Sequence, residues 1–181
     1  GFTLRTYSSE SSVALSVEAG ARGDFAERDR WLERADQYVT DARGEAPAHP
    51  MVLSQSGRVR IAKGQERAGL EDLRASDEAY RSYGRISWEN RLIRARVHLQ
   101  LNEPGAARTV LEEVFSEARA TDAVFWNVYA QALVQTGDLE RAMAVVDRVL
   151  AAAPTNKDAL RIKAAIFERQ GKYAEAGQIE Q

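Results

Sequence analysis

The sequence predicts an all-α protein built from about five tandem helix pairs, the last of them short. Three observations support this prediction. A glycine or asparagine turn recurs along the chain, a small residue stands at a fixed distance before each turn, and no segment beyond the N-terminus alternates like a half-buried strand. With 181 residues, the chain has room for one domain or one short repeat array.

The turns define a register that runs through the chain. Successive turn residues are 41, 38, 35 and 34 positions apart: Gly23, Gly64, Asn102, Gly137 and Gly171. Seven positions before them stand Ser16, Gly57, Ala95, Ala130 and Ala164, all small. Five positions after them stand Arg28, Gly69, Ala107, Ala142 and Ala176. Nine positions after them stand the apolar residues Leu32, Leu73, Leu111 and Val146, and then Glu180, which breaks the series.

Each residue type in this register has a physical reason. Glycine and asparagine adopt the left-handed conformation that ends a helix. Small side chains let two helix backbones approach closely, and an apolar residue fills the groove that they leave. The register therefore predicts helical hairpins that stack on one another.

We expect the helix pairs to span residues 9–43, 50–83, 86–119, 122–152 and 156–181. Together they form one repeat domain over residues 9–181, and residues 1–8 are an N-terminal extension. The connection 44–50 ends the first pair, because its two prolines and glycine cannot continue a helix. Three aspartates stand where they cap the following helices: Asp24, Asp122 and Asp138. Long second helices in the first two pairs explain the wider spacing of their turns.

The third pair turns at Asn102, and Pro104 begins its second helix. The fourth pair has the most specific pattern, with these residues at helical spacing and a closing proline: Trp126, Tyr129, Ala130, Leu133, Ala142, Val146 and Pro154. A shift of 34 positions repeats the pattern in the fifth pair. The arrangement resembles the tetratricopeptide repeat, although Tyr129 and Ala130 replace its leucine and glycine and Val146 replaces its phenylalanine.

This resemblance implies a right-handed α-α superhelix and a non-catalytic scaffold or adaptor that binds an extended protein or peptide segment in its concave groove. In the resembling family, ligand contacts come from the first helix of each pair, three positions before, one after and five after the small residue. Carried over to this register, those positions give the candidate binding residues Arg58, Arg96, Asn127, Gln131, Gln135, Arg161 and Arg169. The lysine and asparagine clamp of the chaperone-binding members is not reproduced in this sequence.

The candidate residues suit a partner with acidic groups or a free C-terminus. Asparagine and glutamine satisfy backbone N–H and C=O groups, and arginine grips a carboxylate with a planar fork. Two alternatives stay open. One is an ordinary solvated helix face. The other is a regulatory sensor for a small effector or an intramolecular partner, because residues 69–119 are similar to the helical-repeat region of large LuxR-type ATP-dependent transcription activators.

Composition and motifs argue against three classes of function: an enzyme, a cofactor or metal site, and direct binding of nucleic acid. The net charge is −2, cysteine is absent, and there is neither a phosphate-binding glycine loop nor a nucleophile elbow. We expect His49 to be a solvated loop residue, His98 to be packed and hydrogen-bonded, and Glu112 and Glu113 to form a solvated face.

No stretch approaches about 18 consecutive apolar residues, so no membrane insertion is expected. The chain begins at Gly1 without a leader-like segment. We therefore expect a cytoplasmic protein, with an exported and processed protein as the alternative. Self-association through the short terminal pair is a further expectation.

Overall fold

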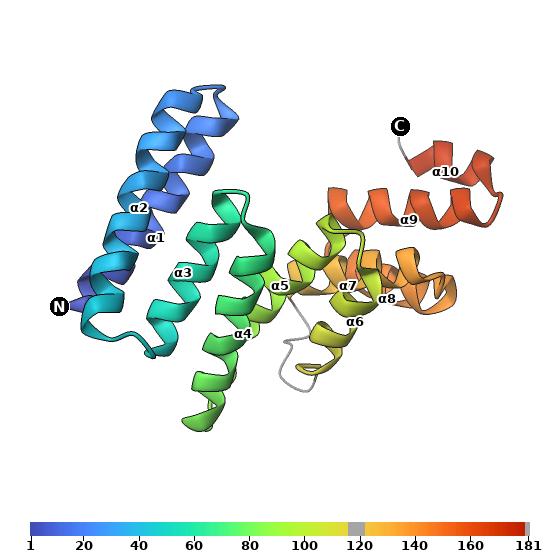
Figure 1. Ribbon diagram of the computed structural model, residues 1–181. Helices are drawn as coiled ribbons and strands as arrows, with labels where there is room; N and C mark the ends of the chain where they lie inside the picture. The colour runs from blue at the N-terminus through green and yellow to red at the C-terminus, as the bar shows by residue number, and fades with distance from the viewer. Residues whose placement is uncertain (116–121, 180–181) are drawn as a thin grey trace. The chain divides into compact units, whose positions relative to one another are not determined.

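A computed structural model describes residues 1–115 and 122–179, which form ten helices and no strand (Figure 1). In chain order the helices are α1 (Phe2–Ala21), α2 (Phe25–Glu45), α3 (Pro50–Ala62), α4 (Glu66–Ser82), α5 (Trp88–Gln100), α6 (Pro104–Glu112), α7 (Ala123–Thr136), α8 (Leu139–Ala152), α9 (Lys157–Arg169) and α10 (Tyr173–Ile179). The all-α prediction is confirmed. The predicted ends of the third and fifth pairs, including Glu180, lie outside the described residues. None of the described helices is both long and apolar enough to cross a membrane.

The chain divides into two compact units, Gly1–Asn90 and Arg91–Gln181. In the first unit α1 packs along α2 and α3 along α4, and α3 also contacts both helices of the hairpin before it (Figure 1). In the second unit α7 packs along α8 and α9 along α10, and α9 contacts both α7 and α8 (Figure 1). Within each unit the hairpins therefore stack in sequence order, as a tandem helical repeat does.

All five predicted turn residues have the left-handed backbone. The φ angles are 79° at Gly23, 75° at Gly64, 58° at Asn102, 85° at Gly137 and 75° at Gly171. Among the described residues, Asn102 is the one non-glycine residue with a positive φ angle, which asparagine tolerates better than most side chains. The predicted positions of the five helix-ending turns are therefore confirmed.

Helices α3 and α4 of the first unit approach each other closely at two glycines. A Cβ added to Gly57 would lie 2.7 Å from Cγ of Leu73 and 2.8 Å from the carbonyl oxygen of Gly69. A Cβ added to Gly69 would lie 2.7 Å from the carbonyl oxygen of Gly57 and 2.5 Å from Cγ1 of Ile61. Both glycines are therefore required by packing, as the register predicted.

The other hairpins place buried small residues at the same register positions. The buried small residues there are Ser16, Ala95, Ala107, Ala130, Ala142, Ala164 and Ala176. Arg28 is the exception, and its side chain runs past Gly20, where an added Cβ would lie 3.4 Å from Cδ of Arg28. In the first hairpin, the space for the Arg28 side chain is thus provided by Gly20, one turn after Ser16 in α1.

Helix α1 begins at Phe2, so the segment predicted as an extension of residues 1–8 is helical. Apart from Ala19, its buried residues carry hydroxyl groups: Thr6, Ser9, Ser12 and Ser16. Thr6 and Ser12 donate to carbonyl oxygens of their own helix, and Ser9 donates to the carbonyl oxygen of Ala35 in α2. These hydrogen bonds allow a polar face to be buried, which a search for apolar periodicity does not detect.

The predicted aspartate caps are confirmed. Side chains of Asp24, Asp122 and Asp138 accept hydrogen bonds from the backbone N–H groups three positions on. The expectation for His49 was wrong, because its Nδ1 accepts from the backbone N–H of Met51 at 3.2 Å and caps α3. His98 is hydrogen-bonded as predicted, with Nδ1 2.8 Å from Oε2 of Glu103.

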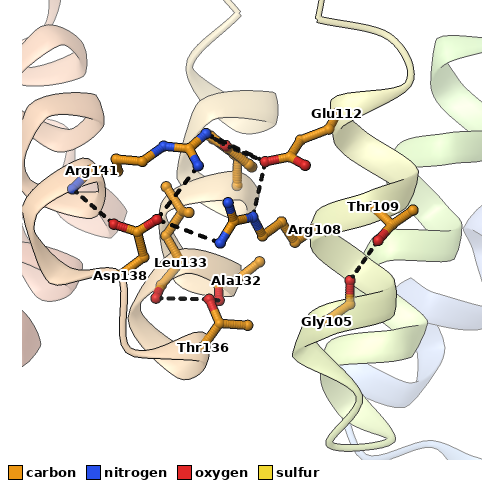
Figure 2. A network of polar contacts seen from close by, with 10 residues as sticks. Gly105, Arg108, Thr109, Glu112, Ala132, Leu133, Thr136, Asp138 and Arg141 are labelled. Atoms are coloured by element: carbon orange, nitrogen blue, oxygen red, sulfur yellow. Dashed lines mark hydrogen bonds and ion pairs between the residues drawn. The ribbon is translucent and has the colours of Figure 1, made fainter.

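A polar network joins α6, α7 and α8 in the second unit (Figure 2). Glu112 accepts hydrogen bonds from Nε of Arg108 and from the hydroxyl of Tyr129, both at 2.9 Å. Arg141 lies 3.3 Å from the same carboxylate, and both arginines also pair with Asp138. Glu112 is thus the centre of a network that the sequence did not predict, while its side chain is exposed, as expected of a solvated face.

The network changes the protonation of its members. Burial alone would raise the pKa of Glu112, but hydrogen bonds from Arg108 and Tyr129, together with the nearby positive charges, lower it. Burial and the hydrogen bond to Glu112 raise the pKa of Tyr129 to about 12. Tyr129 is therefore a neutral donor throughout the physiological pH range.

Replacing Gly57 or Gly69 by alanine is expected to lower the free energy of unfolding by about 1–3 kcal/mol, because the added methyl group overpacks the contact of α3 with α4. Gly105→Ala is the matched control. Gly105 lies in α6 with nothing within 4 Å of an added Cβ, so alanine should stabilise by up to about 1 kcal/mol. Urea unfolding measures all three, and equal effects would contradict the close contact.

The free energy of unfolding is also expected to fall at alkaline pH. The pKa of Tyr129 is 10.0 when unperturbed and about 12 in the folded chain. The contribution of this phenol is therefore complete below pH 10 and is lost as the pH rises through 12.

Tyr129→Phe is the control for this pH dependence, and it should destabilise by about 1 kcal/mol at neutral pH. Urea unfolding at about pH 9 and about pH 11.5 compares the two proteins. The wild-type chain should lose more stability than the variant over this interval. An equal loss in both would contradict the assignment.

Candidate functional site

The second unit contains a groove of about 580 Å³. One residue of α5, six of α7 and five of α9 line it: Arg96, Val124, Asn127, Val128, Gln131, Val134, Gln135, Asp158, Arg161, Ile162, Ala165 and Arg169. Helices α7 and α9 contact each other directly, so the groove runs over two neighbouring first helices of successive pairs. This is the face from which the ligand contacts were predicted.

One face of helix α7 lines the groove, and its other faces pack in the protein core. Phe125, Tyr129 and Ala132 are almost completely buried on the face turned to the core. The groove residues recur at steps of three and four, which places them on one side of a helix. Gln131 in the middle of this side is exposed.

Packing around α7 includes an aromatic cluster. The rings of Phe115 and Tyr129 meet edge to face at 4.6 Å, and those of Phe125 and Trp126 do so at 5.2 Å. Edge-to-face pairs of this kind add to the burial of the rings and restrain their orientation. The rotation of α7 about its axis, and hence the direction of its groove face, is fixed by this cluster.

Two amide oxygens in the groove have no hydrogen-bond partner among the described residues. They are Oδ1 of Asn127 and Oε1 of Gln135, both buried. Nδ2 of Asn127 donates at 3.0 Å to Oδ1 of Asn156, and the same oxygen accepts from the backbone N–H of Ala159 to cap α9. The cap therefore holds the Asn127 amide with its oxygen as the remaining acceptor.

The groove carries an excess of positive charge. Its lining has three arginines and one aspartate, a net charge of +2. Arg161 lies 3.8 Å from Asp158, and both side chains are largely exposed. Arg96 and Arg169 are exposed as well, and within residues 1–115 and 122–179 neither has an acidic partner. Two guanidinium groups are thus available to an external anion.

Six of the seven predicted binding residues line this groove. Arg58 does not, because it belongs to the first unit, where its guanidinium lies 3.4 Å from Glu10 and 3.1 Å from Glu89. A signal for this pairing was present in the sequence, since Glu10, Glu89 and Asp158 all stand 13 positions before a turn residue. In the structure, these acidic residues lie beside two of the predicted binding arginines, Arg58 and Arg161.

The apolar part of the groove was not predicted. Val124, Val128 and Ile162 line it together with the polar residues. They follow the same helical steps as the predicted residues, but the three positions carried over from the resembling family omit them.

The groove offers acceptors and cations rather than a catalytic set. Its one carboxylate is that of Asp158, and the described lining has no histidine, lysine or hydroxyl side chain. Across the described residues, no group of three or more histidine, aspartate or glutamate side chains could hold a metal ion. Amide oxygens suit main-chain N–H groups, and arginines suit carboxylates.

Comparison with known proteins assigns the fold. A sequence profile described as tetratricopeptide repeat matches residues 98–166. MamA from Desulfovibrio magneticus RS-1 is 16% identical, with a TM-score of 0.72 over 95% of this chain and 90% of that one. PilW, described as a widely conserved type IV pilus biogenesis factor, is 16% identical, with a TM-score of 0.71 over 94% of this chain and 74% of that one.

YrrB, described as a TPR protein with an unusual peptide-binding site, is 15% identical, with a TM-score of 0.69 over 93% of this chain and 80% of that one. No curated protein matches the sequence significantly. Likeness at these identities establishes the fold, and the profile match adds the repeat signature itself. Residues 98–166 match the tetratricopeptide-repeat profile, and the chain has the fold of the tetratricopeptide-repeat proteins to which it is similar.

Proposed function

We propose that this chain is a non-catalytic scaffold that binds an extended, acidic segment of a protein partner in the groove over α7 and α9. A protein-interaction scaffold is the general function that the repeat fold supports. The observation that carries the finer proposal is the combination of acceptors and cations without partners, the amides of Asn127 and Gln135 with Arg96 and Arg169, in one groove.

The lining favours a peptide over a small effector. A volume of about 580 Å³ falls within the roughly 300–1,000 Å³ of small-molecule sites. A sensor pocket of that size is mostly apolar and closed, whereas seven of the twelve residues around this groove are charged or carry amides. Exposed arginines and Gln131 leave the groove accessible to an extended chain.

A solved relative lends further support. YrrB, whose fold is similar, is described as having a peptide-binding site. The regulatory sensor segment is the alternative, and the volume of the groove is the observation in its favour. Competition between peptides and small dicarboxylates separates the two proposals.

The test is fluorescence anisotropy with a labelled library of acidic peptides at low salt, where surface charges are least screened. Arg96→Ala and Arg169→Ala should each weaken binding about tenfold, because an arginine–carboxylate hydrogen bond contributes about 1.5–3 kcal/mol. Arg74→Ala is the control, since Arg74 is an exposed arginine of the first unit that pairs with Glu71.

Equal binding by wild type and both groove variants would contradict the proposed site. Displacement of bound peptide by succinate at similar concentrations would favour the sensor alternative. Replacing the glutamates of the best peptide by lysine should abolish binding, and undiminished affinity would contradict the acidic preference.

A further inference from the structure

The connection from α4 to α5 leaves the body of the first unit and returns to it at one buried point. The hydroxyl of Ser76 donates at 2.8 Å to the carbonyl oxygen of Pro50, the first residue of α3, so α3 begins at the level of Ser76. Nδ2 of Asn90 donates to the same hydroxyl at 3.0 Å, and Asn90 is almost completely buried. The chain between Ser76 and Asn90 therefore forms a projection with a fixed base.

The projection has a defined length and a rigid turn. Helix α4 continues for six residues beyond Ser76, about 9 Å of helix, and Figure 1 shows this end of α4 extending past the start of α3. Gly84 ends the helix with a left-handed φ of 66°. Its N–H donates to the carbonyl oxygen of Arg81 at 2.9 Å. The N–H of Arg85 donates to that of Tyr80 at 3.0 Å, which completes a Schellman turn and fixes the backbone.

The end of this projection, residues 81–88, concentrates exposed apolar side chains, and we call it the α4–α5 tip. Residues 81–86 are all exposed. Tyr83, Ile86 and Trp88 are 67%, 40% and 43% exposed, and they are three of the ten large hydrophobic residues exposed in the described part of the chain. Scattered apolar residues are ordinary on a protein surface, but three within six positions of one projection indicate a contact surface.

The α4–α5 tip is also positively charged. Arg81 and Arg85 give it a net charge of +2, and neither has an acidic partner within residues 1–115 and 122–179. Glu89, just after the tip, pairs with Arg58 at 3.1 Å. Glu78 is exposed one turn before the tip on α4. The aromatic side chains are therefore presented together with two guanidinium groups that can meet an external anion.

This combination of side chains fits the interface of an anionic lipid bilayer. Tyrosine and tryptophan are favoured at the level of the lipid headgroups, and arginine is attracted to anionic lipids and binds phosphate. Interfacial segments bury their apolar side chains about 5–10 Å deep, which the length of α4 beyond Ser76 allows. Single-stranded nucleic acid is instead followed by a positively charged groove, whereas this surface projects.

We propose that the α4–α5 tip docks this chain on an anionic lipid bilayer, with Tyr83, Ile86 and Trp88 among the headgroups and Arg81 and Arg85 on the lipid phosphates. The contact is peripheral and requires no spanning helix. It uses residues of the first unit alone, so it is independent of the peptide groove proposed for the second unit. Variants of the tip should therefore bind acidic peptides as the wild type does.

Co-sedimentation of the full chain with phosphatidylcholine vesicles, with and without phosphatidylglycerol, measures the docking. Binding should be at least about tenfold tighter with phosphatidylglycerol, because each arginine near an anionic surface contributes about 1 kcal/mol. Arg81→Gln and Arg85→Gln should each weaken binding about fivefold. Arg74→Gln is the control, since it removes an exposed α4 arginine that pairs with Glu71. No binding, equal binding to both vesicles, or equal binding by all three variants would overturn the proposal.

A pair of tyrosine variants locates the apolar contact. Tyr83→Ser should weaken vesicle binding at least about fivefold, because the ring leaves water when the tip docks. Tyr7→Ser is the matched control, since Tyr7 is 57% exposed on α1 of the same unit. Both positions are exposed, so both variants should fold like the wild type. An equal loss in the two variants would overturn the assignment to the tip.

Brominated acyl chains test whether the ring of Trp88 enters the bilayer, because bromine quenches tryptophan fluorescence only at close range. Vesicles with brominated lipids should quench the wild-type chain. Trp88→Phe should still bind but lose most of this quenching, since Trp31 and Trp126 are half-buried in the folded chain. Undiminished quenching in the bound variant would overturn the proposed insertion.

Competition separates the bilayer from other occupants of the α4–α5 tip. Glycerol phosphate and a single-stranded RNA oligonucleotide should each leave vesicle binding unchanged. Displacement by glycerol phosphate would assign the arginines to a soluble phosphate, and displacement by RNA would assign the tip to nucleic acid. Self-association that Trp88→Ser abolishes, without any vesicle binding, would assign the tip to a second copy of the chain. Each of these three results would overturn the proposal.

Discussion

The close approach of paired helices at small residues is the constraint on which the rest of the structure depends. In the first unit, the backbones of α3 and α4 come so near at Gly57 and Gly69 that a methyl group on either would clash with backbone and side-chain atoms. Alanines take the same register positions in the second unit and are fully buried. Because a contact of this kind permits one rotation of each helix, it decides which residues face the core and which face outward.

The groove follows from that rotation. With Ala130 and Tyr129 buried, the side of α7 that carries Asn127 and Gln131 lines the groove, and α9 repeats the geometry one pair later. The network around Glu112 adds a second restraint, since it ties α7 to the helices before and after it. The candidate binding residues therefore lie on rigid elements, an arrangement that lowers the entropy lost when a partner binds.

The features that could be predicted from the sequence are those that depend on local backbone conformation. Turn residues and small residues act within one hairpin, so they located the helix pairs and, through the register, six of the twelve residues that line the groove. The pairing of Arg58 with Glu10 joins residues 48 positions apart and depends on tertiary packing. The start of α1 at Phe2 was missed because its buried face is polar, and the apolar wall at Val124 was missed because only three register positions were considered.

Side-chain amide NMR of the isotopically labelled chain tests most directly whether this register places peptide-binding residues on α7. Titration with an acidic peptide should shift the amide resonances of Asn127, Gln131 and Gln135 together. The amide of Gln37, which donates to Asp41 in the first unit, should not move. Shifts confined to other amides, or spread equally over both units, would contradict the account.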